Sequence, residues 1–131
     1  MAKKPLTSSQ LINKLQPIFN KFIRLRDEGK PCISCGEYKQ LQAGHYYPVQ
    51  GYAGLRFDED NVHGECAYCN CYDEGHLIGY SENIKERIGE TDYKLLKQRA
   101  EDYKRDGYKF GRAELRELIE LYKSKIKDYE N

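Results

Sequence analysis

The chain has 131 residues, of which 33% are charged and 39% are hydrophobic. This length allows one domain with a modest core, so a bound metal would matter for stability. The net charge of +1 excludes a uniformly basic surface, but residues 1–57 carry a net charge of +6 and residues 58–131 carry −5. The first 26 residues hold six basic side chains and no acid. Such a segment suits a phosphate backbone, although a solvated helix face explains it equally well.

The first predicted element is a basic helix over residues 8–28. Apolar residues recur there at helical spacing, at Leu11, Leu15, Ile18, Phe22 and Leu25. Lys14, Lys21 and Arg24 lie opposite that apolar stripe. Pro17 falls inside the pattern, so a kink or a break into two helices is expected.

Residues 32–66 are predicted to form turns and brief strands, because glycines interrupt this stretch at short intervals. A helix is expected over residues 67–77. Asn70 and Asp73 are three residues apart, which would place both side chains on one face of that helix.

Three further helices are predicted over residues 81–88, 91–105 and 112–129. Ser81 and Thr91 are suitable N-cap residues, and Gly89 and Gly107 are suitable C-terminal stops. The last helix carries an apolar stripe, for which core packing is the ordinary explanation and a dimer interface the alternative. The stripe consists of Leu115, Leu118, Ile119, Tyr122, Ile126 and Tyr129.

Two Cys-x-x-Cys pairs are the strongest chemical signal in the chain. Cys32 and Cys35 form the first pair, and Cys66 and Cys69 form the second. This spacing fits four thiolates around one tetrahedral zinc ion, which leaves no open coordination position and is therefore expected to be structural. In a reducing cytosol, metal binding explains the cysteines better than disulfides do. Cys71 is expected to be a free or packed thiol, or a competing ligand.

Between and after these pairs lie three residues suited to hydrolysis. His45 carries an imidazole that can take a proton from water near neutral pH. Asn61 is expected to accept a hydrogen bond from one ring nitrogen and so to leave the other as the base. Asn70 offers a hard oxygen ligand to a second, catalytic ion, Mg²⁺ or Mn²⁺. This series suits one-metal phosphodiester hydrolysis.

The segments around these residues resemble a known family. Cys32-Ile-Ser-Cys35, Gln42-Ala-Gly-His45-Tyr46, residues 55–64 and Cys66-Ala-Tyr-Cys69-Asn70 are similar to the phage lambda NinG/Rap recombination endonucleases, of the wider HNH, or His-Me finger, group. The resemblance is densest over residues 30–90. It implies a nuclease that acts on branched DNA such as Holliday junctions and D-loops. It also implies that His45 is the general base, Asn61 its orienting residue and Asn70 a metal ligand.

The sequence departs from the broader HNH pattern at one position. Many HNH enzymes place a ligand aspartate immediately before the base histidine, and this chain has Gly44 there. The missing ligand is expected to be Asp73, because of its spacing from Asn70, with Asp60 and His76 as alternatives.

The expected architecture is therefore one α+β domain over residues 1–131. A zinc-stapled ββα-metal core over residues 30–80 would be flanked by the basic N-terminal helix and by C-terminal helices over residues 81–131. Lys14, Lys21, Arg24, Lys39 and Arg56 are the expected DNA contacts. Stacking of unpaired bases on Tyr46, Tyr47 and Tyr52 is an alternative to core packing. His63 is expected to pack in a strand or to contact the DNA backbone.

The expected partners and location follow from this interpretation. Cutting both strands of a junction needs two active sites, so a homodimer is expected, with phage recombination proteins as further partners. No apolar run has the length of a signal peptide or membrane span, so the protein is expected in the cytoplasm of a bacterial host of a phage or prophage. A non-catalytic zinc module that binds DNA or protein, and a nicking nuclease without structural preference, are the alternatives, with a redox protein third.

Overall fold

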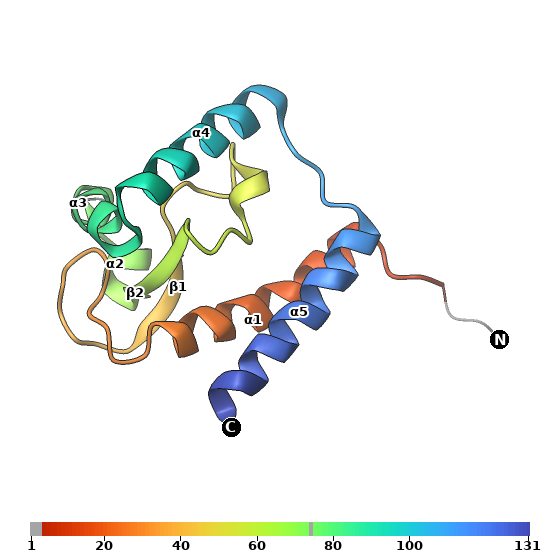
Figure 1. The fold of residues 1–131 in the computed structure, drawn as a ribbon, viewed down its shortest axis with the longest axis horizontal. Helices are drawn as coiled ribbons and strands as arrows, with labels where there is room; N and C mark the ends of the chain where they lie inside the picture. Colours follow the sequence, from red (N-terminus) through yellow and green to blue (C-terminus); the bar gives the residue numbers. More distant parts are fainter. Residues whose placement is uncertain (1–3, 74) are drawn as a thin grey trace.

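The computed structural model describes residues 4–73 and 75–131. A two-stranded antiparallel sheet lies at its centre, with helices on either side (Figure 1). The mixed helix and sheet composition confirms the predicted α+β class. In chain order the elements are α1 (Ser8–Arg26), β1 (Leu41–His45), the 3-10 turn η1 (Ala53–Leu55), β2 (Val62–Cys66), α2 (Ala67–Cys71), α3 (His76–Ile88), α4 (Glu90–Asp106) and α5 (Arg112–Glu130).

Helices α1 and α5 lie side by side and run in the same direction (Figure 1). Their apolar stripes face each other, and aromatic rings fill the interface. The Phe19 ring centroid lies 4.9 Å from that of Tyr122, in an edge-to-face arrangement. The stripe of the last helix is therefore mainly core, as the ordinary explanation predicted, because Leu115, Ile119, Tyr122 and Ile126 are buried in one cluster with α1.

Helix α1 passes through Pro17 without a break, so the predicted division into two helices is wrong. Proline removes one backbone donor, and the packing of the apolar stripe on α5 and the sheet outweighs that loss. The helix ends at Arg26, two residues earlier than expected. Asp27 is its C-cap, and the Asp27 carboxylate turns inward and accepts a hydrogen bond from the Gly64 N–H at 2.7 Å.

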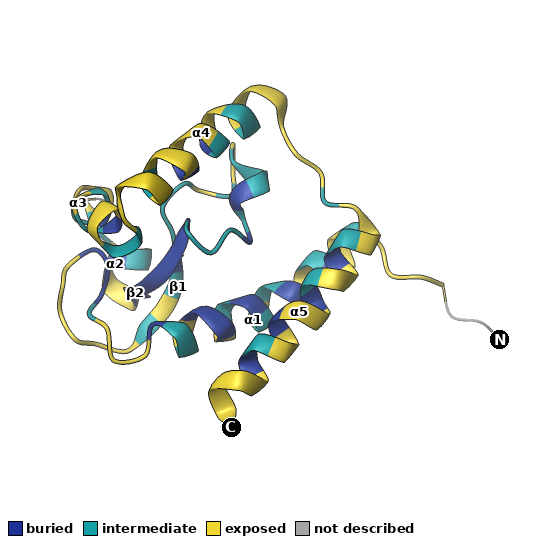
Figure 2. Cartoon of the chain, in the orientation of Figure 1, coloured by how far each residue is buried: buried dark blue, intermediate teal, exposed yellow. Residues whose placement is uncertain are grey.

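A second apolar cluster lies on the other side of the sheet, between η1, α3 and α4. Its buried members are Ile33, Leu55, Tyr80, Ile84, Leu96 and Ala100. Helix α3 packs very close to the segment that carries the first cysteine pair. The approach is so close that a Cβ at Gly79 would collide with the Ser34 carbonyl oxygen. Every residue of β2 is buried, as its continuous dark blue colour in Figure 2 shows, whereas β1 is mostly half-buried.

The helices after β2 differ from the expected boundaries. The predicted helix over residues 67–77 is wrong in length, because α2 ends at Cys71. Helix α3 begins at His76, which puts Ser81 inside the helix and not at its N-cap. Gly89 stops α3 with a φ of 89°, as predicted, and also precedes α4, so Thr91 is not an N-cap either. Within the described residues, no helix combines the length and apolar character needed to cross a membrane.

Candidate functional site

The four cysteines of the two pairs converge at one end of the sheet. Their sulfur atoms all lie within 4.8 Å of one another, and the Cys35 and Cys66 sulfurs are 3.9 Å apart. Tetrahedral zinc with Zn–S bonds of about 2.3 Å requires sulfur separations of about 3.8 Å. The cluster can therefore hold a metal ion such as zinc, with Cys32, Cys66 and Cys69 buried and Cys35 at the surface.

Backbone donors favour the thiolate form of Cys32, whereas burial raises the pKa of Cys35 and of Cys69. The Cys32 sulfur accepts hydrogen bonds from the N–H groups of Cys35, at 3.5 Å, and Cys66, at 3.3 Å. Although burial raises the pKa of Cys32, these backbone donors lower it overall. A lowered pKa favours the thiolate, which is the form that binds metal. Cys71 is exposed and lies outside the group of four, so it is not a competing ligand in this arrangement.

His45 ends strand β1 and is held by a backbone carbonyl. Its Nε2 lies 2.9 Å from the Arg56 oxygen. Burial lowers the pKa of His45. A carbonyl oxygen only accepts, so Nε2 carries the proton and Nδ1 of the neutral ring carries the lone pair. The ring is thus fixed in one tautomer, with Nδ1 as the nitrogen able to act as a base.

The predicted hydrogen bond between Asn61 and His45 is wrong. Asn61 is fully buried, and its Oδ1 accepts from the Tyr47 N–H at 2.8 Å. Its Nδ2 donates to the carbonyls of Tyr47, at 3.0 Å, and Leu55, at 3.1 Å. These three hydrogen bonds of the Asn61 side-chain amide all go to the segment that connects β1 to β2. Because Leu55 directly precedes Arg56, Asn61 shapes the loop whose Arg56 carbonyl fixes His45.

Asn70 and Asp73 do not share a helical face, so that expectation is wrong. Asn70 lies in α2, and its Nδ2 donates to the Gln42 side chain at 2.9 Å. Asp73 lies beyond the end of α2, where its Oδ1 accepts from the Gly75 N–H at 2.9 Å and closes a tight turn. The helix cannot continue through this turn. Within residues 4–73 and 75–131, no hydrogen bond joins His45 to Asn70 or Asp73.

The two faces of the sheet separate the predicted base from the predicted ligand. Gln42 and Gly44 share one face of β1, and His45 points to the other, because strand side chains alternate. Asn70 contacts Gln42 and so lies beside the first face. Gly44 and His45 are the last two residues of β1, so both positions lie at the same end of the strand.

The alternative ligands occupy different surroundings. Asp60 forms an ion pair with Arg99 at 3.5 Å, beside Asp58, which places it away from Asn70. The His76 Nδ1 lies 2.9 Å from the Oε2 of Glu65, a fully buried carboxylate on β2. Sequence reasoning missed Glu65. The signal that could have found it is its place directly before Cys66, at the end of the stretch predicted to form turns and brief strands.

Arg26 and Asp27 were also missed, and they clamp α1 to the sheet. The Arg26 guanidinium donates to both oxygens of Asp27 and to the carbonyls of Glu59, at 2.9 Å, and Val62, at 2.7 Å. Although burial raises the pKa of Asp27, its hydrogen bonds with Arg26 lower it overall. His63 is buried beside this pair, and burial, with the charge of Arg26, lowers its pKa to about 4. His63 is therefore a packed, neutral residue.

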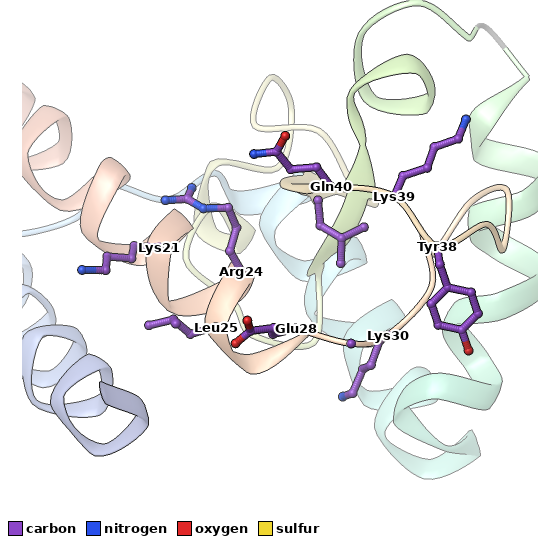
Figure 3. A pocket seen from close by; sticks show the side chains of 10 residues that line it. Lys21, Arg24, Leu25, Glu28, Lys30, Tyr38, Lys39 and Gln40 are labelled. Atoms are coloured by element: carbon purple, nitrogen blue, oxygen red, sulfur yellow. The ribbon is translucent and has the colours of Figure 1, made fainter. Parts of the chain in front are cut away.

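A basic groove collects three of the five predicted DNA contacts. Lys21, Arg24 and Lys39 line a groove of about 690 Å³, together with Lys30 and the exposed Tyr38 (Figure 3). Glu28 also lines it. Lys21 pairs with Glu130 at 2.7 Å and Lys39 with Glu37 at 2.9 Å. Exposed pairs of this kind are weak and exchange readily with phosphate.

The other predicted contacts lie elsewhere. Lys14 is exposed on α1 outside the groove lining. The Arg56 Nε donates to Gln16 on α1 at 2.6 Å, so this guanidinium is held within the chain. The tyrosines considered for base stacking pack on one another and on Tyr80: ring centroids are 4.9 Å apart for Tyr46 and Tyr47, 5.0 Å for Tyr47 and Tyr52, and 5.2 Å for Tyr46 and Tyr80.

Comparisons with known proteins give one consistent family. The family model "NinG: Bacteriophage Lambda NinG protein" matches residues 1–131. Protein ninG of Salmonella phage P22 is 37% identical over 130 residues, which cover 98% of this chain and 61% of that protein. Protein ninG of Escherichia phage lambda is 34% identical over 133 residues, which cover 100% of this chain and 62% of that protein. No solved structure matches significantly.

The chain thus spans about three fifths of the length of these two relatives. The matched region covers almost the whole chain, including the segments that build the cysteine cluster, the sheet and α2. On this basis the chain belongs to the bacteriophage lambda NinG protein family.

Proposed function

We propose that this chain is a metal-dependent DNA endonuclease of the HNH, or His-Me finger, group, acting on branched recombination intermediates such as Holliday junctions and D-loops. The observation that carries the proposal is the imidazole of His45, which a backbone carbonyl holds in one orientation. His45 lies on the β1–β2 hairpin, which ends in the four-cysteine cluster. Helix α2, which follows the hairpin, bears Asn70. The zinc ion would be structural, because four thiolates saturate it.

The proton transfer is assigned to His45. The Arg56 carbonyl accepts from Nε2 at 2.9 Å, so Nδ1 is the atom that takes the proton from water. Burial lowers the pKa of His45 and keeps the ring neutral before the reaction. Asn61 acts through the loop: its three hydrogen bonds fix the backbone that holds the ring.

Asn70 fits a divalent cation, Mg²⁺ or Mn²⁺, as an oxygen donor. Its Nδ2 is engaged by Gln42, which leaves Oδ1 for a cation. When bound, such an ion stabilises the charge that develops on the scissile phosphate and leaving oxygen. Asp73 remains a proposed ligand through Oδ2, because its Oδ1 is held by the Gly75 N–H.

The basic groove supports DNA as the substrate. Four cationic side chains line it, and an exposed tyrosine offers a face for stacking on an unpaired base (Figure 3). Two active sites are needed to cut both strands of a junction, so we propose a homodimer that acts with phage recombination proteins in the host cytoplasm.

The proposal is tested with a labelled four-way junction and a matched linear duplex, each with Mg²⁺ and with EDTA. We expect Mg²⁺-dependent nicking of the junction, at least about 100-fold slower in His45→Ala, because general base catalysis contributes about 10²–10⁴-fold. Asn70→Ala should also lose activity, whereas Asn13→Ala, an exposed asparagine on α1, should not.

Other outcomes would favour the alternatives. Tight binding of the junction without cleavage, unchanged in His45→Ala, would indicate a non-catalytic zinc module. Equal cleavage of the junction and the linear duplex would indicate a nicking nuclease without structural preference.

A further inference from the structure

A buried carboxylate without a full set of partners lies on the face of the sheet that Asn70 flanks. Glu65 is fully buried on β2, directly opposite Gln42 on β1. Its Oε2 accepts from the Ser34 hydroxyl and lies 2.9 Å from the His76 Nδ1. Its Oε1 is also buried, and within residues 4–73 and 75–131 it has no hydrogen-bond partner. A buried carboxylate oxygen without a partner carries a large desolvation cost.

Gly44 shows where that carboxylate sits. A Cβ at position 44 would collide with Oε1 of Glu65 and would lie 2.8 Å from its Cβ. The Glu65 carboxylate therefore fills the space that a side chain at position 44 would occupy. In the broader HNH pattern this position is an aspartate, and in this chain it is Gly44. Glu65, on the opposite strand, places a carboxylate oxygen in that space.

Among the residues that the structure describes, the other acids near the site have no buried carboxylate oxygen that lacks a hydrogen-bond partner. Both oxygens of buried Asp27 are bonded, to Arg26 and to the Gly64 N–H. Asp73 holds the Gly75 N–H, and Asp60 faces Arg99. Asn70 bonds to Gln42, the residue directly opposite Glu65. The anionic oxygen of Glu65 and the amide of Asn70 thus flank the same residue on one face of the sheet.

We propose that Glu65 is the anionic ligand of the divalent cation of this protein, through Oε1. Ser34 and His76 are positioning residues that hold the carboxylate by Oε2, and Gly44 is glycine because Glu65 needs its space. The proposal rests on the proposed function for the identity of the cation, Mg²⁺ or Mn²⁺, which prefers hard oxygen ligands. The His76 side chain is 22% exposed, so the site lies one side-chain layer beneath the surface.

The test measures cation binding without DNA. Tb³⁺ is titrated into the zinc-loaded protein, its tyrosine-sensitised luminescence is recorded, and it is displaced with Mn²⁺. Tyr80 is a suitable sensitiser, since its hydroxyl donates to the Gly44 carbonyl at 2.7 Å. We expect Glu65→Gln to abolish saturable, Mn²⁺-displaceable binding and the matched control Glu86→Gln, at an exposed position on α3, to leave it unchanged.

A folding check and a second variant keep the test decisive. The visible absorbance of the cobalt-substituted cysteine cluster reports whether each variant retains its fold. If Glu65→Gln loses that signal, the cation affinity of His76→Ala is measured instead. We expect it to fall about 10–100-fold, as it does when other residues that orient a metal ligand are replaced. Wild-type affinity in a folded Glu65→Gln, or in His76→Ala, would overturn the proposal.

The two proposals can fail separately. Cation binding that depends on Glu65, in a protein that never cuts DNA, would leave this ligand assignment standing and remove the nuclease. Metal-dependent cleavage of DNA, together with unchanged cation binding in Glu65→Gln, would support the nuclease and remove Glu65 as a ligand.

Discussion

The α1–α5 helix pair and the sheet with its cysteine cluster bury different kinds of groups. The helix pair buries aliphatic and aromatic side chains such as Phe19 and Tyr122. The sheet region buries Asn61, His63, Glu65 and three of the four cysteines, and β2 is coloured as buried along its length (Figure 2). Apolar burial is non-directional and tolerates small shifts. Each buried polar group needs its own partner at a fixed distance. The first region therefore depends on the apolar surface that it packs, and the second depends on the positions of individual polar groups.

The two regions should also respond differently to the substitution of a buried side chain. Truncating a ring in the helix pair removes packed surface and leaves a cavity, at a graded cost. Removing one polar partner near the sheet leaves the other buried and unsatisfied. We expect a variant in the helix pair to lose stability with its metal site intact, and a variant near the sheet to change metal binding, catalytic geometry or the pH dependence of stability.

Removing the metal should have the largest effect. Structural zinc contributes about 10–16 kcal/mol in small zinc-binding peptides, and the cysteine cluster joins the segment before β1 to the end of β2. We expect a strong chelator to abolish amide exchange protection in β1 and β2, with α1 and α5 losing less. Hydrogen exchange measured with and without chelator checks this. Equal protection of the strands in both samples would show that the sheet needs no metal.

Phe19→Ala should be the most damaging single change in the helix pair. Phe19 is fully buried and contacts Phe22, Phe57 and Tyr122. We expect a loss of about 3–5 kcal/mol in the free energy of unfolding, measured by urea denaturation, with the metal stoichiometry of the folded fraction unchanged. Lys14→Ala, at an exposed position on the same helix, is the control and should change stability by less than about 0.5 kcal/mol.

Asp27→Asn should have an intermediate, pH-dependent effect. The substitution removes a charged hydrogen-bond partner of Arg26, which we expect to cost about 1.5–3 kcal/mol at pH 7. The pKa of Asp27 is lowered in the folded protein, below its unfolded value of about 3.9. Its contribution is therefore present above that value and is lost as the pH falls through the folded pKa.

The stability difference between wild type and Asp27→Asn should accordingly shrink on acidification. Urea denaturation from pH 7 down to pH 3 measures it. A difference that stays constant below the unfolded pKa would contradict the assigned pairing with Arg26.

Neutralising the basic groove should have the smallest effect on the fold. Lys21→Ala, Arg24→Ala and Lys39→Ala together should leave stability almost unchanged, since all three side chains are exposed. Junction binding should weaken, and the slope of log K against log salt should fall by about 0.9 for each DNA phosphate that the protein no longer neutralises. Fluorescence anisotropy at several salt concentrations measures this.

A matched triple variant on α4 serves as the control for the groove. Lys94, Lys97 and Lys104 are exposed there, and replacing all three with alanine removes the same number of charges. An equal change of slope in both triple variants would show that the groove has no special role in binding.

The local features of the chain were predictable from its sequence. The helical spacing of Leu11, Leu15 and Phe22 was sufficient for α1, and Gly89 and Gly107 were sufficient for the ends of α3 and α4. The two Cys-x-x-Cys pairs determined the four-cysteine cluster, because each pair is a local unit and only one distance between pairs remained to be closed. These features depend on residues a few positions apart, and local chemistry is enough to specify them.

The site was decided by contacts between segments that are distant in the chain. Only the tertiary structure placed the Arg56 carbonyl against His45, and Asp27 against the Gly64 N–H. It also ended α2 before Asp73 and brought Glu65 into the space beside Gly44. A buried polar atom takes whichever partner the packed chain brings within about 3 Å. Sequence alone determined which residues could do chemistry, and packing chose their partners, because hydrogen bonds depend on distances that only the folded chain defines.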